Sequence, residues 1–367
     1  MPQHELFQPG VLGGMPLRNR TLVAPMTRIS ADASGEVGPL MQTYYEAFGK
    51  GGFAAIVTEG VYTDQYFSQG YEFQPGITTE AQAASWSNLI KGVHSTGAKV
   101  ILQLMHAGAL SQYNRHCDDT RGPSAVQPKG SKMPFYRGTG AFSHTLEMSS
   151  AEISAAIAGF VQSAQRAQDA GADGVEIHGA NGYLLDQFLT DYTNRRSDRY
   201  GGTLRDRIRL TCEVIERVRN AVDRNFTVGV RISQGKVNDF THKWAGGVSD
   251  AQIIFKAMEA SGANYIHTTE FAADAPAFEQ GKSLAAMAKS FTSLPVIANG
   301  GLGDREIADR MIATGDCDFV AIGKAALAAP DWPTRARNGQ GCREFDFEMF
   351  SPLANLETAN AFALKNA

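Results

Sequence analysis

The stretch SAEISAAIAGFVQSAQRAQDAGADGVEIHG (150–179) contains one complete unit of the fold, a helix followed by a strand. Its first part, residues 150–171, has a helical pattern that opens on Ser150 as a capping residue and closes on Gly171. Its last part, GVEIHG (174–179), is a short apolar run typical of a buried strand. Helices that alternate with buried strands predict a parallel sheet with helical crossovers.

The same alternation continues in both directions along the chain. Candidate strands are residues 20–26, 53–60, 99–108, 174–179, 226–233, 264–269, 294–301 and 318–324. Helical patterns lie between them at 41–51, 79–97, 150–171, 204–222, 249–262 and 304–315, with Thr79, Ser249 and Asp304 as further capping residues. Eight such units predict a closed (β/α)8 barrel, a single domain over residues 1–367 with long loops after its second and third strands.

Composition excludes several classes of function. The chain has 367 residues, of which 43% are hydrophobic and 20% charged, and its net charge of -4 argues against a nucleic-acid or anionic-lipid partner. The four cysteines, Cys117, Cys212, Cys317 and Cys342, have no metal-like spacing and are expected to be reduced thiols. The polar N-terminus MPQHELFQPG and the absence of an apolar run of about 20 residues predict a cytoplasmic protein without a membrane span.

Polar and glycine residues stand where the predicted strands end, and barrel enzymes carry their chemistry at that face. The residues at these ends are Pro25, Met26, Thr27, Thr58, Glu59, Gln103, His178, Arg231, Thr268, Asn299, Gly300, Gly301, Gly323 and Lys324. The glycines after strands seven and eight, together with Lys324, suit a phosphate. Gln103 and Arg231 suit a flat ring with carbonyl edges, so the set favours FMN. The alternative is that the glycines only turn the chain and Arg231 pairs with a buried carboxylate.

Four motifs occur in order along these positions. They are APMTR (24–28), LQLMHAG (102–108), an H-x-x-N-x-Y pattern at 178–183 and NRRSDRYGG (194–202). With them the chain closely resembles the old yellow enzyme family of FMN-dependent ene reductases, from LFQP at residue 6 to PDWP at residue 330. In NRRSDRYGG we expect the arginines to pair with carboxylates and the two glycines to turn the chain, without a catalytic role.

The resemblance implies a catalytic set. His178 and Asn181 would hold the carbonyl oxygen of an α,β-unsaturated substrate above the flavin, where two donors stabilise the developing enolate-like charge. Hydride would pass from flavin N5 to the β-carbon, and Tyr183 would protonate the α-carbon from the opposite side. Met105 stands where some relatives have tryptophan, so the substrate pocket is expected to be roomier there.

The resemblance also implies a cofactor set. Thr27 would contact flavin O4, with backbone contacts from Pro25 and Met26, while Gln103 would hold the pyrimidine edge. Arg231 would stabilise negative charge near N1 and O2. The phosphate would be bound by Asn299, Gly300, Gly301, Gly323 and Lys324. The last is usually arginine in the family, and lysine keeps the charge but loses the bidentate fork.

Two long excursions, residues 61–77 and 107–149, follow strands two and three. We expect the second to cover the barrel mouth and shape the substrate pocket, with an oligomer contact as the alternative. His106 and His116 lack a third ligand with suitable spacing, so no metal site is expected.

The expected electron donor is inferred from a comparison with larger members of the family. They append an iron–sulfur site and further domains, for which this chain has neither the cysteines nor the length, so NADPH or NADH is the expected reductant. The sequence therefore predicts an NAD(P)H-dependent ene reductase. A flavin-dependent dehydrogenase or demethylase of a specialised metabolite and a non-catalytic flavin sensor remain as alternatives, and a homo-oligomer stays open.

Overall fold

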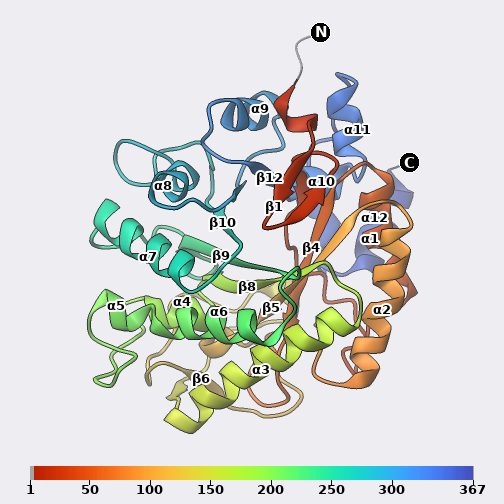
Figure 1. Ribbon diagram of the computed structural model, residues 1–367. Helices are drawn as coiled ribbons and strands as arrows, with labels where there is room; N and C mark the ends of the chain where they lie inside the picture. The colour runs from red at the N-terminus through yellow and green to blue at the C-terminus, as the bar shows by residue number, and fades with distance from the viewer. Residues whose placement is uncertain (1–3, 367) are drawn as a thin grey trace.

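Eight parallel strands close into a barrel in the computed structural model, which describes residues 4–366 (Figure 1). In order around the barrel they are β3 (Thr21–Val23), β4 (Ala55–Tyr62), β5 (Lys99–Met105), β8 (Gly174–Asn181), β9 (Thr227–Lys236), β10 (Tyr265–Thr269), β11 (Val296–Asn299) and β12 (Phe319–Ile322). Because β12 pairs with β3, the barrel sheet has no free edge. This confirms the predicted (β/α)8 fold. The single-domain prediction over 1–367 includes residues 1–3 and 367, which lie outside the described residues.

Helices surround the barrel, as Figure 1 shows. They are α1 (Pro39–Lys50), α2 (Glu80–His94), α3 (Ser150–Asp169), α5 (Leu204–Arg207), α6 (Arg209–Ala221), α7 (Val248–Ala260), α8 (Leu284–Phe291), α9 (Arg305–Ala313) and α10 (Lys324–Ala328). The sequence did not predict α8, which connects β10 to β11, and the helix expected over 204–222 is two consecutive helices.

Two of the four expected helix caps are wrong. Thr79 and Asp304 cap α2 and α9 as predicted. In α3 the cap is Ser149 rather than Ser150, because the Ser149 hydroxyl and the Glu152 side chain satisfy each other's backbone N–H groups. In α7 the chain enters the helix at Gly247, whose positive φ turns the backbone two residues before Ser249.

An N-terminal hairpin packs against one end of the barrel interior. Its strands are β1 (Gly10–Leu12) and β2 (Met15–Leu17), and neither was predicted. Leu12, Met15 and Leu17 form one buried cluster with barrel side chains that include Leu22 and Ile101. Gly13, at the turn of the hairpin, faces Thr227 at the start of β9 and Asn264 just before β10. The hairpin therefore covers the N-terminal end of the barrel and leaves the C-terminal end for ligands.

Further segments lie outside the barrel strands, and most of them surround the opposite end. The excursion after β5 contains a small two-stranded sheet, β6 (Thr120–Gly122) with β7 (Thr145–Glu147), and a 3-10 turn at Pro134–Tyr136. After β12 come α10, α11 (Trp332–Arg337) and α12 (Leu356–Lys365), and α12 packs beside α1. Short α4 (Leu184–Leu189) follows β8 directly.

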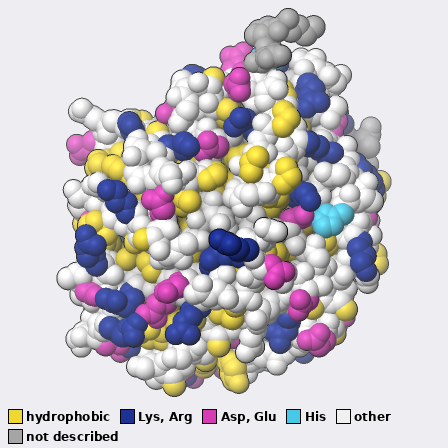
Figure 2. Space-filling view, in the orientation of Figure 1, with side chains coloured by type: hydrophobic (Ala, Val, Ile, Leu, Met, Phe, Trp, Pro, Cys, Tyr) yellow, Lys and Arg dark blue, Asp and Glu magenta, His cyan; other side chains and the backbone are white. Residues whose placement is uncertain are grey.

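The surface and the thiols agree with the composition. Basic and acidic side chains are intermixed on the face shown in Figure 2. All four cysteines are free. No helix within residues 4–366 combines the length and the apolar character that a membrane crossing requires.

Candidate active site

A cleft of about 950 Å³ opens at the C-terminal ends of the strands. It brings together every residue to which a site role was assigned from the sequence, although these come from separate strands. They are Pro25, Met26, Thr27, Gln103, Met105, His178, Asn181, Tyr183, Arg231, Asn299, Gly300, Gly301, Gly323 and Lys324. The individual roles of these residues stay predictions. Thr58, Glu59 and Thr268, also at predicted strand ends, do not line the cleft.

His178 and Asn181 reach the cleft from the end of β8. The His178 ring is buried, its Nδ1 has no partner among residues 4–366, and burial beside Arg231 lowers its pKa to about 3. His178 is therefore neutral at physiological pH, with one N–H to donate. Asn181 has a φ of 61°, a left-handed conformation that is uncommon for a non-glycine residue. A hydrogen bond from its N–H to Ser233 Oγ (2.8 Å) and one from Val237 N to its carbonyl (3.1 Å) hold this backbone.

Tyr183 is linked to a residue to which the sequence assigned no role. Its hydroxyl lies 2.5 Å from the hydroxyl of Tyr71, a residue of the 61–77 excursion. The Tyr71 ring in turn packs 4.8 Å, centroid to centroid, from Tyr136 of the second excursion. Burial raises the pKa of Tyr183 above its usual value, so the phenol keeps its proton at neutral pH. The only sequence signal for Tyr71 was the aromatic content of its excursion.

Arg231 and Gln103 line the floor of the cleft. Arg231 Nη2 donates to Asn299 Oδ1 (2.7 Å), while its Nε has no partner and no carboxylate of residues 4–366 lies within ion-pairing distance. The alternative in which Arg231 pairs with a buried carboxylate is therefore wrong for the described chain. Burial lowers its pKa to about 10, which leaves the guanidinium charged at neutral pH. A buried cation that no carboxylate contacts directly, beside a cleft, suits an anionic or electron-rich ligand edge.

The β11 end forms a backbone cradle. Gly300 has a φ of 136°, and an added Cβ would collide with the carbonyl oxygen of Glu270, so only glycine fits there. Gly301 also has a positive φ, of 69°. Lys324 Nζ lies 4.9 Å from the ring centroid of Phe347 and has no carboxylate partner within residues 4–366. Exposed backbone beside an unpaired lysine fits a phosphate.

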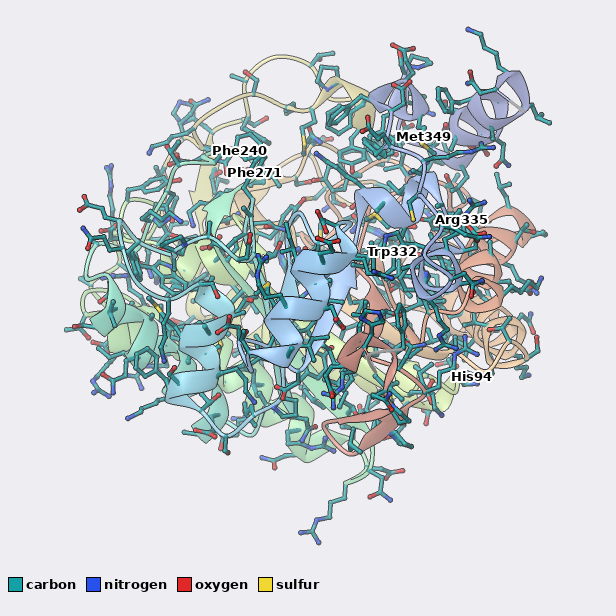
Figure 3. All side chains as sticks on the ribbon, turned by 90° about the horizontal axis from the view of Figure 1, so that it is seen from above. His94, Phe240, Phe271, Trp332, Arg335 and Met349 are labelled. Atoms are coloured by element: carbon teal, nitrogen blue, oxygen red, sulfur yellow. The ribbon has the colours of Figure 1, made fainter. Side chains whose placement is uncertain are left out.

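Several cleft residues were not predicted from the sequence. Met133, Phe135 and Tyr136 line it from the second excursion, the segment that we expected to shape the substrate pocket. Further lining residues, Cys342, Arg343, Glu344, Phe345, Phe347 and Phe350, come from the segment after the barrel. Phe240 and Phe271 stand at the rim with 81% and 95% of their surface exposed, and Figure 3 shows them in the same region of the molecule.

In the motif at 194–202, two of the three arginines pair with carboxylates as we expected, whereas Arg195 forms no ion pair within residues 4–366. Arg196 pairs with Asp198 at 2.6 Å, Arg199 pairs with Glu213, and Gly202 turns the chain with a φ of 83° just before α5. Within residues 4–366, no three His, Cys, Asp or Glu side chains are grouped as a metal site would require.

The closed (β/α)8 barrel, with a cleft at the strand ends that holds polar side chains among apolar ones, is the arrangement of barrel enzymes. The chain belongs to the NADH:flavin oxidoreductase / NADH oxidase family, which matches residues 5–341. It is 33% identical to an NADH oxidase of Thermoanaerobacter brockii over 346 residues, 91% of this chain and 51% of that protein. It is 31% identical to 12-oxophytodienoate reductase 2 of Arabidopsis thaliana, covering 90% of this chain and 87% of that one.

A solved structure is similar over the same extent. The old yellow enzyme homologue from Zymomonas mobilis has a TM-score of 0.84 and 26% identity, with 96% of this chain and 99% of that chain covered. The resemblance stated from the sequence motifs is thereby confirmed. The chain spans about half the length of the T. brockii protein.

Proposed function

We propose that this protein is an NAD(P)H-dependent ene reductase that binds FMN and reduces the C=C bond of α,β-unsaturated carbonyl compounds. One observation carries the proposal: His178, Asn181 and Tyr183 share a single cleft with the Gln103–Arg231 floor and the Gly300–Gly301 cradle. The floor and the cradle fit the two ends of FMN, a ring with polar edges and a phosphate. When bound, FMN supplies the hydride.

The residues of this chain would hold the substrate and deliver a proton. Neutral His178 and the Asn181 carboxamide each offer an N–H to the substrate carbonyl oxygen, and two such donors stabilise the negative charge that grows there. Tyr183 offers its hydroxyl proton to the α-carbon, and Tyr71 donates a hydrogen bond to the phenol oxygen that becomes charged. The buried site keeps both tyrosines protonated.

The names of the relatives support this choice of substrate and reductant. One relative is named as an NADH oxidase, and another as a reductase of 12-oxophytodienoate, a name that denotes an oxo group and two C=C bonds. We infer that a nicotinamide cofactor reduces the bound FMN and leaves before the alkene enters. Whether NADH or NADPH is preferred is decided by comparing both donors in the same assay.

The test separates the two halves of the reaction. The FMN-loaded protein is reduced anaerobically with NADH or NADPH, and cyclohexenone, maleimide and acrylate are then added in turn. We expect the absorbance of the oxidised flavin to return with at least one alkene. Reoxidation by dioxygen but by no alkene would favour a flavin sensor, and a protein that stays colourless with added FMN would overturn the proposal.

A further inference from the structure

A buried polar network lies beneath the floor of the cleft, centred on Glu176 of β8. Its carboxylate accepts hydrogen bonds from Gln103 Nε2 (2.8 Å), from the Tyr265 hydroxyl (3.0 Å) and from His267 Nδ1 (2.8 Å). Tyr265 and His267 come from β10, on the far side of β9. Glu176, Tyr265 and His267 are fully buried, and none of them lines the cleft.

The network fixes a buried negative charge at this position. Burial alone disfavours the carboxylate, but His267, Arg231 and the surrounding donors more than offset it and lower the pKa of Glu176 to about 2. A carboxylate can only accept hydrogen bonds, so Gln103 must turn its amino group towards Glu176. The carbonyl oxygen of Gln103 is then available to the cleft as an acceptor.

Arg231 lies next to this charge. In the strand register it stands opposite His178 on one side and His267 on the other, so the strands of Glu176 and His267 flank it. No carboxylate of residues 4–366 forms an ion pair with Arg231, and Glu176 therefore acts on it across a gap. In a buried site a charge still acts strongly at that range, because little water screens it.

We propose that Glu176 is a positioning residue for the flavin: it directs the Gln103 carbonyl oxygen towards the ring N–H and weakens the positive field of Arg231 at the pyrimidine edge. This inference rests on the proposed function. A reduced flavin carries more negative charge at that edge, so Glu176 lowers the reduction potential of the bound FMN. Without Glu176, Arg231 would favour the reduced form more strongly.

Two substitutions test the proposal, because they should shift the reduction potential of FMN in opposite directions. Glu176→Gln removes the charge with little change in shape, and we expect a more positive FMN reduction potential and a several-fold weaker affinity for oxidised FMN. Tyr265→Phe removes one donor and keeps the carboxylate, which leaves its charge less shielded, and we expect a small shift to a more negative potential. The potentials are measured on FMN-loaded protein by equilibration with a reference dye.

The outcomes distinguish this inference from the proposed function. A purely structural role for Glu176 would lower the unfolding temperature of both variants and leave both potentials at the wild-type value, which would overturn the inference. If Glu176→Gln does not fold, an unchanged reduction potential in Tyr265→Phe alone would overturn the inference. A wild-type protein that takes up no FMN would instead overturn the proposed function, and the inference with it.

Discussion

Tyr183 and Tyr71 share one hydrogen bond, yet their hydroxyls are expected to matter to different extents. Tyr183→Phe removes the proposed acid, so alkene reduction should slow by about 10²-fold or more, while reduction of the flavin by the nicotinamide changes little. Tyr71→Phe leaves the acid in place and should slow alkene reduction only a few-fold. Stopped-flow measurement of the two half-reactions checks both variants.

The comparison is decisive because the proposed mechanism assigns the two half-reactions to different residues. Equal slowing of both half-reactions in Tyr183→Phe would remove the proton-donor role. A loss in Tyr71→Phe as large as that in Tyr183→Phe would instead make the pair, and not Tyr183 alone, the source of the proton.

Among elements, the turn from β11 to α9 depends on glycine. Gly300→Ala should weaken FMN binding strongly, because the new Cβ collides with the Glu270 carbonyl and displaces the cradle. Gly315→Ala is the matched control: its φ is also positive, 76°, but its Cβ meets no atom within 4 Å, so only about 1 kcal/mol of stability should be lost. Titration of both apoproteins with FMN checks this, and equal affinities would contradict the cradle.

The junction of β4 and α1 should give unfolding a pH dependence. Glu59 of β4 accepts hydrogen bonds from Arg28 N (2.9 Å) and from the Tyr45 hydroxyl of α1 (3.2 Å), and burial raises its pKa from 4.5 to about 7. The folded state thus holds a proton that the unfolded state releases. This contribution to stability is fully present below pH 4.5 and is lost as the pH rises through 7.

Glu59→Gln mimics the protonated carboxyl at every pH. Between pH 5 and pH 8 the wild-type protein should therefore lose stability that the variant keeps, on the order of 3 kcal/mol. The unfolding temperature of the variant should rise relative to that of the wild-type protein over this range. Thermal unfolding of both proteins across that range measures it. A difference that is constant with pH would contradict the assignment.

Helices and strands could be predicted where a local feature of the sequence, an apolar run or a capping residue, determines them. All eight barrel strands follow from short apolar runs, and Thr79 and Asp304 cap their helices as expected. Helix α8 was missed because it has only eight residues, Leu284–Phe291, and so short an apolar segment cannot be told from a strand or loop by its pattern. The β1–β2 hairpin was missed because its strands have three residues each and gain their stability from the barrel that they cover.

At the scale of the whole molecule, the stabilisation of the fold by a bound flavin should show whether the phosphate site is used. FMN that binds only the folded state raises the free energy of unfolding, by about 4 kcal/mol at a concentration of 1,000 times Kd. The unfolding temperature therefore rises with the FMN concentration. Riboflavin, which lacks the phosphate, should stabilise less. Lys324→Ala should reduce the FMN effect and leave the riboflavin effect unchanged; an equal reduction of both would show that Lys324 does not bind the phosphate.

The site was predictable where a residue stands at the end of a strand. The barrel gathers those ends into one cleft, which is why His178, Gln103 and Arg231 meet although they are far apart in sequence. Residues that act from outside the strands, such as Tyr71, could not be assigned, since its contact with Tyr183 joins positions 112 residues apart. The hydrogen bond between His267 and Glu176 depends in the same way on distant pairing inside the barrel.

His178, Asn181 and Tyr183 all belong to the end of β8 and the first turn after it. The walls of the cleft come instead from the second excursion, from the loops after β9 and β10, and from the segment after the barrel. Chemistry and selectivity are thus encoded in separate stretches of the chain. Exchanging residues 107–149 for the equivalent stretch of a relative should consequently alter which alkenes are accepted, while the proposed catalytic residues stay in place. This loop is therefore the natural place to begin directed evolution.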